Sequence, residues 1–378
     1  MIVFLIYKHN YSFSYQVKVH SLRQEEKMGI LSFLVWALLI LALSLNAANG
    51  DPLVPAFNIF GDSVVDAGNN NNLGTLVKAN FLPYGRDFLT HKPTGRFCNG
   101  KLAIDFTVEY LGFDLYPPAY LSKEATGNNI LTGVNFASAS SGYYDGTAQL
   151  YRAVTLTQQM KYYQEWQDEV VNMVGREKAD DIFAGGIHLL SAGSSDFLQN
   201  YYIVPFFNVV YTPDRFSNFL MKSYTTFVQK MYGLGAKRIG VTNLPPMGCL
   251  PAAITLFGGG SNECVSRLNQ DAVLFNNKLK STSQDLKNKL PGLKLVVFDI
   301  YSPLLSLITN PTDTGFFESR RACCGTGTIE TSFLCNSRSV GTCSNATEYV
   351  FWDGFHPSEA ANEYLAQSLV VQGFELIS

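Results

Sequence analysis

The chain has 378 residues, of which 47% are hydrophobic and 16% are charged, with a net charge of −3. This composition is too apolar for a disordered chain, and the length suits one large domain or two ordinary ones. No Lys/Arg-rich run occurs, which argues against nucleic acid as a partner, because binding to a phosphate backbone needs a basic patch.

The chain begins with a segment typical of an export signal. Residues 30–45 (ILSFLVWALLILALSL) are uncharged and apolar, and the small residues NAANG follow them. We therefore interpret residues 1–50 as a signal-peptide region cleaved near Gly50, with Met28 as the working start and the part before it as an upstream extension. The alternative is an N-terminal membrane anchor, but the run is shorter than the roughly 20 residues of a spanning helix. After cleavage, no stable membrane span is expected.

Short apolar runs alternate with longer helical patterns along the rest of the chain. Five strands are predicted, at residues 57–60, 133–136, 187–192, 238–242 and 293–299. Their continuous hydrophobicity indicates a buried parallel sheet. Four helices are predicted from their periodicity and start signals, at residues 157–173, 214–233, 265–289 and 358–374. Thr157 and Ser358 are the expected N-caps of the first and the last. Residues 51–378 are thus predicted to form a single three-layer α/β domain.

Seven cysteines suggest an oxidising compartment. Four of them crowd into residues 323–343, and no Cys-x-x-Cys pair or zinc-finger spacing occurs. We therefore predict that the cysteines form disulfides and leave one free thiol. Which cysteines pair does not follow from the sequence. Asn345-Ala346-Thr347 is a glycosylation sequon, which matters only in a secreted chain.

A serine stands directly after the first predicted strand. The apolar run FNIF breaks into the triplet Gly-Asp-Ser, which ends at Ser63. Ligands of open parallel sheets bind at the carboxyl ends of the strands, so Ser63 is a candidate nucleophile. The small-residue stretches NFASASSGYYDG (135–146) and SAGSSDF (191–197) lie at the ends of the next two predicted strands and could supply donors to an oxyanion. Each of these turns is also compatible with an ordinary loop.

A serine nucleophile needs a base, and three histidines follow the predicted signal region. His188 lies inside an apolar strand and is interpreted as a core residue, and His91 lies in a polar loop with no partner in sequence. His356 stands three residues after Asp353 in the tight loop WDGFHP. Such a loop can hold a carboxylate against one imidazole nitrogen and leave the other free, as a Ser-His-Asp triad requires. The alternative is a surface Asp and His ahead of the last helix.

Four sequence blocks occur in an order typical of one hydrolase family. FGDSVVDAGNN, GVNFASASSG, GSSDF and WDGFHPSEAAN resemble the four blocks of the GDSL esterase/lipase family, the SGNH hydrolases. GRFCNGKLAIDF, LPPMGCLPA and FFESRRACCGTG resemble its plant secreted branch. The resemblance extends over about residues 55–375. It implies a flavodoxin-like three-layer α/β/α fold with a central parallel sheet, and hydrolysis of carboxylic esters without a cofactor or a metal.

The resemblance also implies roles for individual residues. By position in the blocks, Ser63 would be the nucleophile, and Asp353 and His356 would complete the triad. The implied oxyanion donors are the backbone N–H of Ser63, Gly142 and Ser195.

The third block departs from the family pattern at Ser195, where the family carries an asparagine. A serine hydroxyl can donate one hydrogen bond, but it is shorter than an amide side chain and rotates freely. The second block offers Ser140 and Ser141 where a glycine is also expected, so the position of the oxyanion glycine is open by a residue or two.

The departure at Ser195 leaves two further hypotheses beside a secreted serine esterase/lipase. An acyltransferase would share the acyl-enzyme and pass the acyl group to an alcohol, and a weakly catalytic relative would bind acyl or glycan ligands. The presence of all three triad residues favours chemistry over binding alone. The predicted partner is a small-molecule or lipid ester, and the plant resemblance implies an extracellular location in the cell wall or apoplast. The natural substrate and the oligomeric state do not follow from the sequence.

Overall fold

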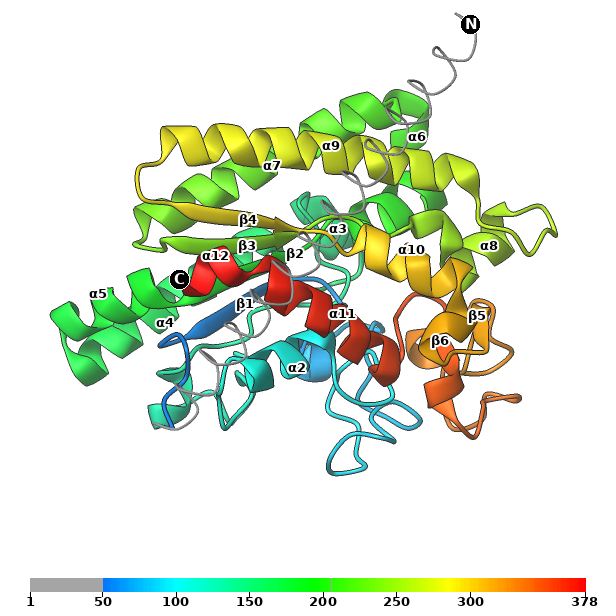
Figure 1. The fold of residues 1–378 in the computed structure, drawn as a ribbon, viewed down its shortest axis with the longest axis horizontal. Helices are drawn as coiled ribbons and strands as arrows, with labels where there is room; N and C mark the ends of the chain where they lie inside the picture. The colour runs from blue at the N-terminus through cyan, green and yellow to red at the C-terminus, as the bar shows by residue number, and fades with distance from the viewer. Residues whose placement is uncertain (1–49, 205) are drawn as a thin grey trace, which may run out of the picture. The chain divides into compact units, whose positions relative to one another are not determined.

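Four parallel strands make up the central sheet (Figure 1). In order across the sheet they are β1 (Phe57–Gly61), β2 (Ile187–Ser191), β3 (Arg238–Thr242) and β4 (Lys294–Phe298). The computed structural model describes residues 50–204 and 206–378, so the predicted signal sequence and the start at Met28 lie outside the described residues. Four of the five predicted strands are confirmed, each to within one residue at both ends.

The fifth predicted strand, residues 133–136, is wrong as a regular strand. The segment runs beside β1, but only Asn135 forms a β-bridge with Ile59. The acceptors of its remaining backbone donors do not form a second ladder, since they are the carbonyl groups of Ile130 and Pro118 and the side chain of Asn58. The Val134 N–H donates to the side-chain oxygen of Asn58 at 3.0 Å, for example. An apolar run alone predicted a strand here because it carries no information about these buried amide partners.

This segment nevertheless extends the sheet on the side of β1 that faces away from β2. The Ile59 N–H donates to Val134 O at 3.1 Å, and the Phe136 N–H donates to Ile59 O at 2.7 Å. Across the sheet the order is therefore residues 133–136, β1, β2, β3 and β4. Numbered along the chain, this is the order 2-1-3-4-5 of flavodoxin-like folds. In such a sheet the crevice for ligands opens where the strand order reverses, and here that is beside the carboxyl end of β1.

Helices cover the sheet in a three-layer α/β/α arrangement, as Figure 1 shows. The helix α2 (Ala103–Tyr110) packs against α11 (Glu359–Gln372), and α7 (Pro213–Gly233) packs against α9 (Ser266–Lys289). The remaining α-helices are α3 (Asp145–Leu150), α4 (Leu156–Val174), α5 (Arg176–Gly185), α6 (Phe207–Val210), α8 (Pro251–Phe257), α10 (Tyr301–Thr309) and α12 (Phe374–Ile377). Within the described residues, no helix is both long and apolar enough to cross a membrane.

Of the two predicted helix caps, one is confirmed and one is wrong. Ser358 caps α11, since its hydroxyl accepts the Ala361 N–H at 3.2 Å. The first predicted cap, Thr157, is wrong, because α4 begins at Leu156 after the cap residue Thr155. The Thr157 N–H donates instead to the carboxylate of Asp145 at 3.2 Å. Because Asp145 satisfies the Thr157 N–H, Thr157 can lie in the first turn, and the N-cap lies two residues earlier than predicted, at Thr155.

The cysteines form three disulfides and leave one thiol, as the sequence predicts. The pairs are Cys249–Cys264, Cys323–Cys343 and Cys324–Cys335, and the remaining Cys98 is buried. Two of these bonds brace the segment between β5 (Glu318–Ala322) and β6 (Tyr349–Phe351), a short parallel pair outside the main sheet. This braced segment comes directly before the loop that carries Asp353 and His356 in the sequence.

Candidate active site

Ser63 lies two residues beyond β1, at the carboxyl edge of the sheet. Gly61 ends the strand with a φ of 137°, and a Cβ atom there would lie 1.9 Å from Ser191 O, so the close approach requires glycine. The Asp62 N–H donates to the same carbonyl at 3.0 Å and ties the turn to the end of β2. The predicted break in the apolar run is therefore a fixed turn that leads directly to Ser63.

The three residues predicted to act together are brought into contact. His356 Nε2 lies 2.7 Å from Ser63 Oγ, and His356 Nδ1 lies 2.7 Å from Asp353 Oδ1. The backbone N–H of His356 also donates to Asp353 Oδ1, at 2.9 Å. The imidazole is buried, and its ring lies 5.1 Å from the ring of Phe97, centroid to centroid. Side chains 293 residues apart in the sequence thus form one hydrogen-bonded line.

Asp353 is fully buried and receives hydrogen bonds on both carboxylate oxygens. Burial alone would raise the pKa of this carboxyl, but the His356 imidazole beside it and the hydrogen bonds from His356 and Tyr84 hold the pKa below its ordinary value. The Tyr84 hydroxyl donates to Asp353 Oδ2 at 2.6 Å, and the Thr331 hydroxyl donates to it at 3.1 Å. A carboxylate held in this way stays ionised and keeps the imidazole in one orientation.

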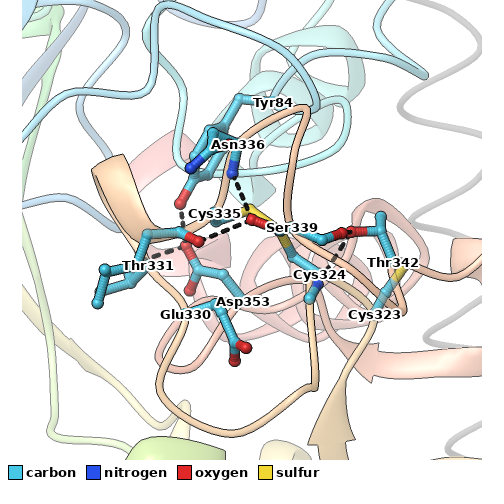
Figure 2. The surroundings of a disulfide bond; sticks show 12 residues. Tyr84, Cys323, Cys324, Glu330, Thr331, Cys335, Asn336, Ser339, Thr342 and Asp353 are labelled. Carbon is cyan, nitrogen blue, oxygen red and sulfur yellow. Dashed lines mark hydrogen bonds between the residues drawn. A yellow bond between two sulfur atoms is a disulfide. The ribbon is translucent and has the colours of Figure 1, made fainter.

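Figure 2 shows how the cysteine-rich segment supports this carboxylate. Thr331 lies inside the loop closed by the Cys324–Cys335 disulfide, and its hydroxyl reaches Asp353. The Ser332 N–H in turn donates to the Tyr84 hydroxyl at 2.7 Å. Sequence reasoning missed Tyr84 and Thr331, because neither has a motif and both reach Asp353 only through the tertiary fold.

A cavity of about 230 Å³ opens onto Ser63 and His356. Its wall is mostly apolar and includes Val64, Val77, Phe97, Tyr151, Leu198, Ile203, Pro245, Leu250, Phe333, Leu334 and Phe355. The polar members of the wall, besides Ser63 and His356, are Ser194, Ser195, Gln199, Thr331 and Ser332. An apolar wall with a few polar groups beside a nucleophile is typical of a small-molecule site.

The implied oxyanion donors differ in their places around this cavity. Ser63 and Ser195 belong to its wall, whereas Gly142 packs against Asp196, where a Cβ atom would lie 2.4 Å from the carboxylate. Among the residues that the structure describes, the backbone N–H groups of Ser63 and Gly142 have no acceptor. Ser140 has a φ of 67°, the left-handed conformation that favours glycine, at a position where the family pattern also expects one.

Two buried carboxyl groups border the site. Burial raises the pKa of Asp62 to about 7, against a hydrogen bond from the Val64 N–H and the attraction of His356. Burial likewise raises the pKa of Asp196 to about 7, although the Thr147 hydroxyl and backbone N–H groups donate to it. Near neutral pH both groups therefore change charge, whereas the pKa of Asp353 is held below its ordinary value.

The two other histidines in the described part of the chain, His188 and His91, make no hydrogen bond with Ser63. His188 is buried in β2, where its Nε2 lies 2.9 Å from the Tyr163 hydroxyl, and burial lowers its pKa to about 4. This agrees with its interpretation as a core residue. His91 is exposed, with its Nδ1 2.8 Å from Arg86 O. Over residues 50–204 and 206–378, no cluster of three His, Cys, Asp or Glu side chains is arranged to hold a metal ion.

Comparison with known proteins agrees with the blocks and with the fold. The family model of the GDSL-like lipase/acylhydrolases matches residues 58–369. Two Arabidopsis thaliana proteins named GDSL esterase/lipase are 66% identical over 93% of this chain and 100% of theirs, and 69% identical over 87% of this chain and 94% of theirs. The Arabidopsis GDSL esterase/lipase APG is 57% identical over 92% of this chain and 98% of its own. With the matched region covering the sheet and Ser63, Asp353 and His356, this chain belongs to the GDSL-like lipase/acylhydrolase family.

Proposed function

We propose that this hydrolase is a secreted serine esterase/lipase in which Ser63, His356 and Asp353 form the catalytic triad. The observation that carries the proposal is the continuous hydrogen-bonded line from Asp353 Oδ1 through both nitrogens of His356 to Ser63 Oγ, with 2.7 Å at each step. A general base must lie within about 2.6–3.2 Å of the proton that it removes, and His356 satisfies this condition. Membership in an esterase/lipase family supports the same reaction class.

The geometry gives each group a defined task in ester cleavage. His356 Nε2 takes the proton of Ser63 Oγ while that oxygen attacks the carbonyl carbon, and Asp353 stabilises the imidazolium that forms. The proton then passes from His356 to the departing alcohol as the C–O bond breaks, which leaves Ser63 acylated. A water molecule that gives its proton to His356 attacks this acyl-enzyme and releases the acid. The proposed donors to the oxyanion are the backbone N–H groups of Ser63 and Gly142 and the side-chain hydroxyl of Ser195.

The proposed substrate is a small-molecule or lipid ester whose acyl part enters the apolar cavity beside Ser63. Labelling with a fluorophosphonate probe, followed by peptide mapping, tests the nucleophile, and a panel of esters of graded chain length tests the acyl part. Label on Ser63 together with release of free acid supports the proposal. An unlabelled, folded protein would indicate a binding protein, and transfer of the acyl group to an added alcohol in preference to water would indicate an acyltransferase.

Secretion is the second part of the proposal. Cleavage near Gly50 would leave residues 51–378 as a single mature domain, with a glycan on Asn345. Three disulfides suit an oxidising compartment, and Asn345 is exposed, so a glycan there would extend into solvent. N-terminal sequencing of the exported protein tests the cleavage site, and a mass shift on glycosidase treatment tests the glycan.

Ser195→Asn is expected to hold or raise the activity. The substitution puts an amide donor at the place where the family pattern has one, and loss of such a donor elsewhere costs about 2.7–4 kcal/mol. The measurement is kcat and KM on a short-chain ester, with the unfolding temperature as the control for folding. A collapse of kcat in a normally folded variant would mean that Ser195 serves another purpose than oxyanion donation.

Tyr84→Phe is expected to lower kcat about tenfold, the effect of roughly 1.4 kcal/mol on the barrier. Phenylalanine keeps the ring in the cluster with Trp352 but removes the donor to Asp353 and the acceptor of the Ser332 N–H. Hydrogen bonds to charged groups contribute about 1.5–3 kcal/mol, so the unfolding free energy should also fall. Tyr232→Phe, which removes a hydroxyl bonded to Pro291 O at the surface, is the matched control. An unchanged kcat in Tyr84→Phe would show that Asp353 is held without the phenol.

A further inference from the structure

The cavity wall holds one carboxamide side chain, that of Gln199, among the described residues that line it. Gln199 shares this wall with Ser63, Ser195 and His356. Its Oε1 atom is fully buried and has no hydrogen-bond partner, and its Nε2 atom donates to none of the described residues. Buried polar groups in native proteins are nearly always paired, so an unpaired amide beside a nucleophile calls for an explanation.

The helix that carries Gln199 begins next to Ser195. Both residues lie at the start of the π-helix Asp196–Ile203, with Ser195 as its cap and Gln199 four residues later. Long side chains in helices point back towards the N-terminus and cover the residue three or four positions earlier. π-helical turns are rare and occur often at functional sites. This spacing and the shared cavity wall put Gln199 and Ser195, the expected oxyanion donor of the third block, on the same side of the helix.

The other carboxamides near the site are already engaged. Asn200, the next residue, is buried and donates from Nδ2 to the Thr147 hydroxyl at 3.0 Å. Gln159 donates from Nε2 to Gly61 O at 2.9 Å and to Ser141 Oγ at 3.0 Å. Asn70 donates from Nδ2 to Val77 O at 2.9 Å and to Ala139 O at 3.1 Å. Asn70 and Gln159 use both N–H groups of their amides in these contacts, and Asn200 uses one of its two and does not line the cavity.

We propose that the Gln199 carboxamide donates a hydrogen bond to the oxyanion and supplies the amide that Ser195 lacks. Unlike Oε1, the Nε2 atom is not among the buried atoms without a partner, so its N–H groups keep accessible surface and are free to meet a bound substrate. Glutamine is one methylene longer than asparagine, which suits a donor that reaches back from the following helical turn. The role rests on the proposed esterase function, because an oxyanion forms only when Ser63 attacks an ester.

The primary test is Gln199→Leu, which keeps the volume of the side chain and removes its donor. We expect kcat on a short-chain ester to fall roughly 10- to 100-fold, less than for a lone oxyanion donor because Ser195 and backbone N–H groups remain, with KM changed less than twofold. Asn208→Leu, which replaces an exposed carboxamide on α6, is the matched control and should keep the wild-type kcat. A wild-type kcat in Gln199→Leu, or a rise in KM alone, would overturn the inference.

A second variant separates donation from packing. Glutamate has the shape of glutamine, but its carboxylate repels an oxyanion and its protonated form can donate. The ratio of the Gln199→Glu kcat to the wild-type kcat should therefore rise as the pH falls from 8 towards 5. A ratio independent of pH would assign Gln199 a purely structural role and contradict the proposal, and this readout remains usable if Gln199→Leu does not fold.

A double-mutant cycle with Ser195→Asn tests whether the two positions share one task. If the new asparagine takes over the donation, Gln199→Leu should lower kcat less in the Ser195→Asn background than in the wild type. An equal loss in both backgrounds would contradict the inference. Labelling of wild-type Ser63 by the fluorophosphonate is measured in parallel, because its failure would remove the proposed function itself, whereas its success with a null effect at Gln199 removes only this inference.

Discussion

Ser63→Ala is expected to reduce hydrolysis of short-chain esters to background while the protein stays folded. In another serine hydrolase, loss of the nucleophile lowers kcat by about 10⁶-fold, because binding and the remaining donors cannot replace the covalent step. The fold should persist, since the Ser63 side chain contacts His356 through one hydrogen bond and is only half-buried. The measurement is kcat on a chromogenic ester, with circular dichroism and the unfolding temperature as controls.

The matched control for this change is Ser281→Ala, which removes an exposed hydroxyl on α9 that donates to Lys278 O. It should leave both kcat and the fluorophosphonate label intact. Full activity retained in Ser63→Ala would refute the mechanism. Labelling of another residue in place of Ser63 in the wild-type protein would refute it as well.

Asp353→Asn is expected to lower kcat by about 10⁴-fold with little change in KM, as the same change does in a serine protease triad. The asparagine cannot stabilise the imidazolium, and its amide group can turn an N–H towards His356 and favour the wrong tautomer. Asp353 Oδ1 also accepts the backbone N–H groups of Phe355 and His356, both at 2.9 Å, so some loss of stability is expected as well.

Two measurements separate these effects. The unfolding temperature reports the loss of backbone hydrogen bonds, and the rate of fluorophosphonate labelling at Ser63 reports how well His356 activates the serine. Near-normal labelling in a folded Asp353→Asn variant would contradict the proposed role of the carboxylate. Comparison with Tyr84→Phe then shows how much of that role depends on the partner that orients Asp353.

The residues of the candidate site could be predicted from the sequence to different extents. Ser63 was predictable because a strand ended there, and parallel strands present their ligands at that end. Asp353 and His356 were predictable because they share one short loop. Tyr84 lies 269 residues from Asp353 in the sequence, and no local pattern indicates that a tyrosine hydroxyl will meet a buried carboxylate.

Similar limits applied to the fold. The continuous apolar strands indicated a buried parallel sheet, because burial on both faces leaves a signal in every residue of a strand. Residues 133–136 gave the same signal without forming a regular strand, since buried amides such as that of Asn58 satisfy part of their backbone. The cap of α4 was misplaced because Thr155 and Thr157 are equally good caps, and the contact of Thr157 with Asp145 decided between them.

Local order along the chain was enough to identify the hydrolase family, the layer architecture and the three residues of the proposed triad. These depend on motifs and on periodicity, which a single segment carries. Disulfide pairing, the partners of Asp353 and the unpaired amide of Gln199 were decided by the tertiary structure alone. Each of them depends on which distant side chains meet and which buried polar atoms are left without a partner, and such distances arise only when the chain has packed.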